Sequence, residues 1–361
     1  MAKHLLPSGN HGLDFDLQRP SDRPLGPPEP DDPEPPAPDA VHRRDARRID
    51  PLASAPDRLH LADEVHARPP DALATPSRAT YVAIMVPPER REQELAHLAA
   101  LCTQYALPAP PVDARHFSAD MGALRFKWER HGEFSGYTFF TPGRSPVPFS
   151  EPPIRHLPPG WLAAVPGTTL VAAHAKLIPD AGEPDTGFLG AHFAGNMVVG
   201  AEIGGGTGLA FTDFRIHADG FARFVVVDRG FTKRQAGRMM QRLFEIEAYR
   251  MLALLALPLA RALAQRIAAI EGALVTLTDD IARHSVDDET LLQQLTRLAD
   301  EVEQSVASSQ FRFGACRAYY ELVTTRMGEL REQRLSGIQT IEEFMARRFT
   351  PAAGTCNTVS Q

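Results

Sequence analysis

The segment LRFKWERHGEFSGYTF, residues 124–139, decides the fold. Apolar and polar side chains alternate over 124–130 and again over 133–139, which is the two-residue period of strands with one polar face. The His131-Gly132 pair between the two runs is suited to a tight turn. The segment therefore predicts a β-hairpin whose aromatic side chains fill a core rather than stack on nucleobases.

Further strands are predicted on both sides of this hairpin. The apolar run 81–86 is closed by two prolines, as expected of a buried strand, and a helix over about 89–105 follows it. The other candidate strands cover 169–178, 196–203, 209–216 and 221–228. Residues 58–230 therefore indicate an α+β head domain built on a mostly antiparallel sheet.

The apolar period becomes helical from residue 231. The first helix continues past Pro258, where we expect a kink. Two further helices, over 291–302 and 316–330, carry apolar residues at alternating spacings of four and three. This pattern predicts a long α-helical hairpin or coiled-coil-like stalk over 231–350, and we expect a flexible tail over 351–361.

Composition bounds the remaining possibilities. Residues 1–57 are rich in Pro, Asp and Arg and poor in large apolar residues, which predicts a disordered tail. The net charge of −7 indicates no nucleic-acid partner. The three cysteines form no metal clip, and the N-terminus lacks the apolar core of a signal peptide, so we expect a cytoplasmic protein. The longest apolar run, 251–260, is shorter than the roughly 20 residues that a membrane helix needs.

Several separated motifs carry a family resemblance. They are Glu64-Val65-His66-Ala67-Arg68-Pro69, residues 125–134, Thr212-Asp213-Phe214-Arg215, and Phe313-Gly314-Ala315-Cys316-Arg317-Ala318-Tyr319-Tyr320. From about Leu59 to Cys356 the chain resembles the bacterial family catalogued as domain of unknown function 3422. The resemblance implies no catalytic residues. Members of that family usually continue into a C-terminal hydrophobic segment similar to a membrane anchor, so the resemblance implies inner-membrane association only where such a segment is present.

The first candidate site lies in the motif at the start of the head domain. Glu64 and His66 share one face if their segment is extended. Carboxylate and imidazole groups bind divalent metals and carry protons, so this pair is a candidate acid/base or metal site, with Arg68 holding an anionic substrate. The sequence indicates no motif for any cofactor other than a divalent metal.

The second candidate site lies at the hairpin turn. Glu129, His131 and Glu133 share one face if the strand continues through the turn. With Arg130 they are candidate catalytic residues, and His131 and the two glutamates, together with His66, are candidate metal ligands. The interpretation that we favour is that Arg68, Arg125 and Arg130 neutralise these carboxylates in structural ion pairs.

Two other motifs have structural interpretations. The run Gly204-Gly205-Gly206 lacks the Lys-Ser/Thr ending of a phosphate-binding loop and precedes a strand, so we interpret it as a hairpin turn. Glu247 and Arg250 lie three residues apart in the first long helix and are expected to form an ion pair.

Two functions remain open at this point. We expect a non-enzymatic scaffold or interaction protein, a homo-oligomer through the helical stalk, whose head binds a protein partner that the sequence does not identify. The alternative is an enzyme or metal-dependent protein that uses the Glu/His groups. An ion-transport-related protein is a lesser alternative, based on architectural analogy alone.

Overall fold

The structure, a computed structural model, describes residues 58, 61–62, 69–182 and 184–360. Contacts divide the chain into Met1–Leu59 and His60–Gln361, and all helices and strands that the structure describes belong to the second unit. The predicted disordered tail, residues 1–57, lies outside the described residues.

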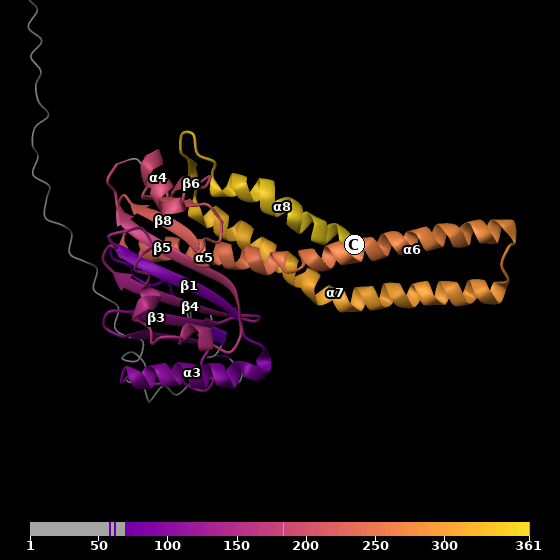
Figure 1. Cartoon of the computed structure of the whole chain (residues 1–361), viewed down its shortest axis with the longest axis horizontal. Helices are drawn as coiled ribbons and strands as arrows, with labels where there is room; N and C mark the ends of the chain where they lie inside the picture. Colours follow the sequence, from indigo (N-terminus) through magenta and orange to yellow (C-terminus); the bar gives the residue numbers. More distant parts are fainter. Residues whose placement is uncertain (1–57, 59–60, 63–68, 183, 361) are drawn as a thin grey trace, which may run out of the picture. The chain divides into compact units, whose positions relative to one another are not determined.

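This unit contains one mixed sheet of nine strands (Figure 1). The strands are β1 (Ser77–Met85), β2 (His116–Asp120), β3 (Arg125–Arg130), β4 (Ser135–Pro142), β5 (Thr168–Pro179), β6 (Val199–Ile203), β7 (Gly208–Thr212), β8 (Ala222–Asp228) and β9 (Gln333–Arg334). Their order across the sheet is β2-β3-β4-β1-β5-β8-β7-β6-β9. Among these strands β5 and β8 pair in parallel and the other neighbours pair antiparallel.

Six α-helices accompany the sheet in the described part of the chain. They are α3 (Arg91–Gln104), α4 (Thr186–Phe193), α5 (Lys233–Leu254), α6 (Leu257–Arg283), α7 (Asp288–Leu330) and α8 (Ile341–Val359). Thr232 and Gln235 form a capping box that starts α5, and Pro258 lies in the first turn of α6, where its missing N–H costs no helical hydrogen bond. The chain therefore changes helix at Leu255–Ala256, next to the predicted kink.

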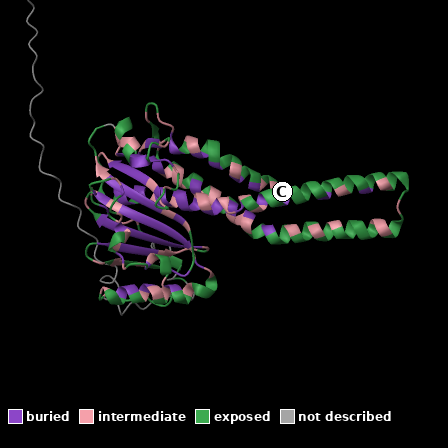
Figure 2. Cartoon of the chain, in the orientation of Figure 1, coloured by how far each residue is buried: buried purple, intermediate pink, exposed green. Residues whose placement is uncertain are grey.

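The central strand β1 is buried on both faces (Figure 2). Tyr81 and Ala83 belong to a core that α5, α7 and α8 share, whereas Val82 and Ile84 belong to a core that α3 covers. Successive side chains of a strand point to opposite faces, so one apolar run supplies both cores. This explains why the sequence of residues 81–86 is continuously apolar and does not alternate with polar residues.

Helices α6 and α7 lie antiparallel and are joined by residues 284–287. Arg266 of α6 pairs with Glu301 of α7 at 3.3 Å. Most residues of this pair are exposed, shown green in Figure 2, whereas α5 and the end of α7 pack together beside the sheet.

The predicted mixture of helix with a mostly antiparallel sheet is confirmed, including the hairpin of β3 and β4. The glycine run 204–206 is also a hairpin turn, between β6 and β7, and all three glycines have positive φ, which a side chain would disfavour.

Three expectations are corrected. The strand predicted over 209–216 ends at Thr212, because Asp213 accepts a hydrogen bond from the backbone N–H of Arg215 and Phe214 has φ of 50°. The two helices predicted over 291–302 and 316–330 are one helix, α7. The chain from 351 to 359, predicted as a flexible tail, continues α8 and buries Ala353 and Cys356.

Candidate ligand-binding cavity

A cavity of about 300 Å³ lies between one face of the sheet and helices α5 and α7. Tyr81 of β1 and Phe244 of α5 stack at 5.1 Å and form part of its apolar lining. Charged and polar groups line the rest. The lining residues from the sheet side include Asp71, Lys127, Glu129, His131 and Thr138, and those from the helices include Gln241, Arg242, Glu245, Tyr249 and Arg326.

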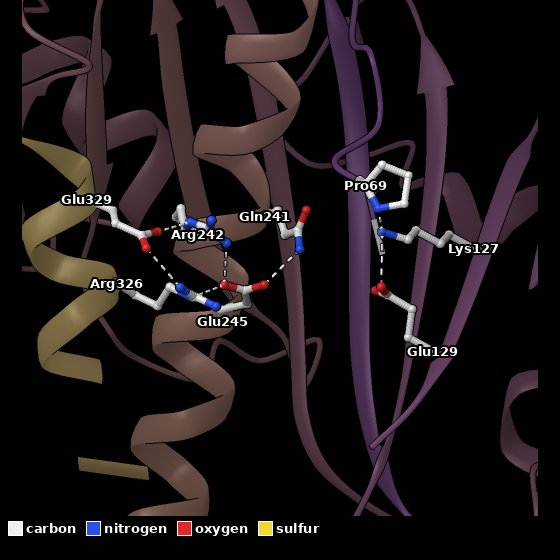
Figure 3. A network of polar contacts seen from close by, with 8 residues as sticks. All are labelled: Pro69, Lys127, Glu129, Gln241, Arg242, Glu245, Arg326 and Glu329. Atoms are coloured by element: carbon white, nitrogen blue, oxygen red, sulfur yellow. Dashed lines mark hydrogen bonds and ion pairs between the residues drawn. The ribbon is translucent and has the colours of Figure 1, made fainter. Parts of the chain in front are cut away.

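Strand β3 supplies one charged wall. Lys127 and Glu129 are two residues apart and therefore share a face of the strand, and their side chains pair at 3.1 Å. Lys127 Nζ also donates to the carbonyl oxygen of Pro69 at 3.2 Å (Figure 3). The same Nζ lies 3.8 Å from Asp71. The ammonium group of this largely buried lysine is thus neutralised, as a buried charge requires.

Helices α5 and α7 supply the opposite wall (Figure 3). Glu245 accepts from Gln241 at 2.7 Å and from Arg242 at 2.8 Å, and Arg326 Nε lies 2.5 Å from it. Arg326 also donates to Glu329 at 2.9 Å, and Glu329 pairs with Arg242 as well. Each carboxylate therefore bridges two arginines, one from each helix.

A short segment before β1 closes one side of the cavity. Leu73 N–H donates to the carbonyl of Lys233 at 3.0 Å, and Arg125 donates to the carbonyl of Ala72 at 3.1 Å. Gly237 of α5 makes this approach possible, because a Cβ at that position would lie 1.5 Å from the carbonyl oxygen of Asp71. The segment is thereby held against both α5 and β3.

The charges that line the cavity cancel. The cations Lys127, Arg242 and Arg326 match three carboxylates, those of Asp71, Glu129 and Glu245. Burial raises the pKa of Tyr81 well above its ordinary value, and the charges of Tyr249, Glu129 and Glu245 raise it further. The tyrosine hydroxyl therefore remains a neutral hydrogen-bonding group at physiological pH.

The structure separates the residues predicted at the hairpin turn. Glu129 and His131 both line the cavity. Arg130 pairs with Glu94 at 2.9 Å, and Glu133 pairs with Arg312 of α7. Because β3 ends at Arg130 and β4 begins at Ser135, Glu133 is not on the continuous strand face that the prediction required.

The carboxylates at this turn are thus in separate ion pairs, but Arg125 and Arg130 are not their partners. Glu129 pairs with Lys127 and Glu133 with Arg312, whereas Arg125 pairs with Asp71 and Arg130 with Glu94. Within the described ranges, no group of three or more His, Cys, Asp or Glu side chains is arranged to hold a metal ion. The other predicted residues, Glu64, His66 and Arg68, lie outside the described residues.

Glu94 is a buried acid that the sequence analysis did not identify. Its carboxylate has no exposed surface and accepts from Trp128 at 3.0 Å, Tyr137 at 2.7 Å and Arg130 at 2.9 Å. Its position with Leu98 and Leu101 on the buried side of α3 was the available signal, because an acid on an apolar helix face requires partners.

Together these features define an α/β protein with a charge-balanced cavity between its sheet and helices α5 and α7. A family model described as "Protein of unknown function (DUF3422)" matches residues 53–361, so the chain belongs to this family, and the resemblance is confirmed. Comparisons with curated proteins and with solved structures gave no match.

Proposed function

We propose that this protein is a non-enzymatic scaffold that self-associates through α6 and residues 288–311 of α7, which form a stalk, while the sheet and α5 form a head. The observation that carries the proposal is the apolar surface of this helix pair. Nine of its large apolar side chains are exposed, namely Ile267, Leu274, Val275, Ile281, Leu292, Leu295, Val302, Val306 and Phe311. Such a surface on two antiparallel helices is suited to a second pair in a four-helix bundle.

The charge of the stalk favours a second copy over a lipid surface. Residues 257–303 contain nine acids and four arginines, and five of the acids flank the turn between α6 and α7. An acidic turn is repelled by anionic lipid headgroups and resists insertion into a bilayer. The stretch Lys233–Arg283 contains an 18-residue window that is apolar enough to span a membrane, with mean hydropathy 1.5, and 22% of that window is buried. The α5 part of the stretch packs within the head.

Sedimentation velocity of the full chain over a range of concentrations tests this proposal, with flotation on anionic vesicles as a second arm. Self-association supports a homo-oligomeric scaffold. A protein that stays monomeric and floats with vesicles supports the membrane surface instead, and one that stays monomeric and does not float overturns both.

We propose as a second candidate an enzyme or metal-dependent function at the cavity, because Glu129 and His131 both line it. Elemental analysis of the protein purified without an affinity tag tests this alternative. A stoichiometric divalent metal that His131→Ala abolishes supports it, and the absence of metal from both proteins argues against a metal-dependent role.

A further inference from the structure

A second cleft lies beside the loop that follows the end of β7. It has a volume of about 620 Å³ and lies between the start of β5, the loop 214–218 and helix α5. Its lining includes His217 and Arg215 from the loop and Glu247 and Arg250 from α5. None of these residues lines the cavity described above, so the cleft is a separate site.

Asp213 and His217 form an acid–imidazole pair at this cleft. Asp213 Oδ2 lies 2.9 Å from His217 Nε2, and the Asp213 side chain is fully buried. The carboxylate is fixed by two further donors, Asn196 Nδ2 at 2.8 Å and the backbone N–H of Arg215 at 3.2 Å. The ring N–H does not lie on the line to the carboxylate, so the contact is a close polar approach rather than a linear hydrogen bond. Because Asp213 engages Nε2, Nδ1 is the ring nitrogen that remains for a ligand.

Two guanidinium groups accompany this pair. Arg250 uses Nε and Nη2 to bind Glu247, at 3.1 and 2.6 Å, and its remaining Nη1 makes no hydrogen bond to the described residues. Arg215 is exposed, and no carboxylate of the described chain pairs with it. A guanidinium group with free N–H donors is suited to bind the oxygens of a carboxylate or phosphate.

Phe214 holds the loop in an unusual conformation. Its φ of 50° lies in the left-handed region, which is costly for a residue with a side chain. The backbone N–H of Phe214 donates to Thr212 Oγ1 at 3.2 Å, and its ring stacks on Phe344 at 5.0 Å and lies under the guanidinium of Arg250. Packing from α5 and α8 thus maintains a turn that places Asp213, Arg215 and His217 around one cleft.

We infer that this cleft is an acid–base site for a small molecule that carries an oxyanion, either a carboxylate or a phosphate. Arg215 and Arg250 Nη1 hold the oxyanion. Neutral His217 takes a proton at Nδ1 from a hydroxyl group of the ligand or from a water: that O–H bond breaks, an N–H bond forms, and no electron is transferred. Asp213 is a positioning residue that fixes the ring and stabilises the imidazolium. This inference does not depend on self-association of the stalk.

The test uses the full chain and two probes, inorganic phosphate and acetate, followed by histidine ring signals in ¹H–¹⁵N NMR spectra. His217→Gln assigns the signal. We expect a millimolar concentration of at least one probe to shift the His217 signal, and Arg215→Ala to weaken that binding at least about tenfold. The exposed Arg297→Ala on α7 is the control and should leave binding unchanged. A shift with phosphate alone identifies a phosphate ligand, and one with acetate alone a carboxylate.

A second variant separates positioning from folding. Asp213→Asn keeps the shape of the side chain but removes its charge, so we expect it to alter the protonation and tautomer signals of His217 while phosphate or acetate still binds through the arginines. The inference is overturned if neither probe shifts His217, or if Arg215→Ala and Arg297→Ala bind the probes equally. Because Arg215 is exposed, its replacement leaves the fold intact. Weaker binding of the probes by Arg215→Ala therefore reports the loss of the guanidinium group and not unfolding.

Discussion

The carbonyl oxygen of Asp71 occupies the space that a Cβ at Gly237 would need, 1.5 Å from its position. Gly237→Ala must therefore displace either α5 or the segment that closes the cavity. We expect it to lower the free energy of unfolding by more than about 2 kcal/mol, measured by urea denaturation.

Gly272→Ala is the matched control for this change. Gly272 is an exposed residue in α6 with no atom near the added Cβ, so alanine should raise stability by about 0.5–1 kcal/mol through helix propensity. Equal effects of the two substitutions would contradict the close approach of Asp71 to α5.

Replacement of Glu94 by alanine is expected to cost about 3 kcal/mol of stability. The change leaves three donors, on Trp128, Tyr137 and Arg130, without their buried acceptor. Glu92→Ala, at an exposed position two residues earlier in α3, should change stability by less than about 0.5 kcal/mol. Chemical denaturation of both variants decides whether this carboxylate stabilises the packing of α3 on the sheet.

Glu332 should make stability fall as pH rises. Burial raises its pKa to about 7, from an ordinary value of 4.5, and the carboxylate of Glu342 adds to the rise. Between pH 4.5 and about pH 7 the folded protein keeps a proton on Glu332 that the unfolded chain has lost. The free energy of unfolding therefore falls by about 1 kcal/mol or more as the pH rises through this range. Unfolding measured at about pH 5 and about pH 8 should show a smaller loss for Glu332→Gln. The same loss in wild type and variant would count against this assignment.

The strands were predictable where alternation or a continuous apolar run marked them, as in β1, β3 and β4. Strands β2 and β9 were not predicted. Strand β2 is short and half exposed, with Phe117 its one large apolar residue, and β9 has only two residues. Strand β7 was predicted to extend to residue 216, because apolar residues recur at Phe214 and Ile216. Only the Asp213 turn and the packing of Phe214 on Phe344 end it.

Only the wall of the cavity that the sheet supplies could be predicted from the sequence. Glu129 and His131 follow from the two-residue spacing of the predicted strand, although β3 itself ends at Arg130. Arg242 and Glu245 lie three residues apart in α5 and pair locally, but their role as a cavity wall depends on Arg326, which α7 brings back beside α5. Such a contact is set by the path of the chain between α5 and α7, and no local pattern encodes it.

The central claim is that the stalk holds copies of the chain together, and sedimentation velocity of a triple variant tests it most directly. Leu292, Val306 and Phe311 are 66%, 56% and 73% exposed, so replacing all three with serine leaves the core intact. The control replaces Val112, Val147 and Met197 with serine; these residues are 89%, 59% and 83% exposed and lie outside the stalk. We predict that the wild type and the control sediment as an oligomer and the stalk variant as a monomer. A monomeric wild type, or a stalk variant that remains oligomeric, would contradict the account.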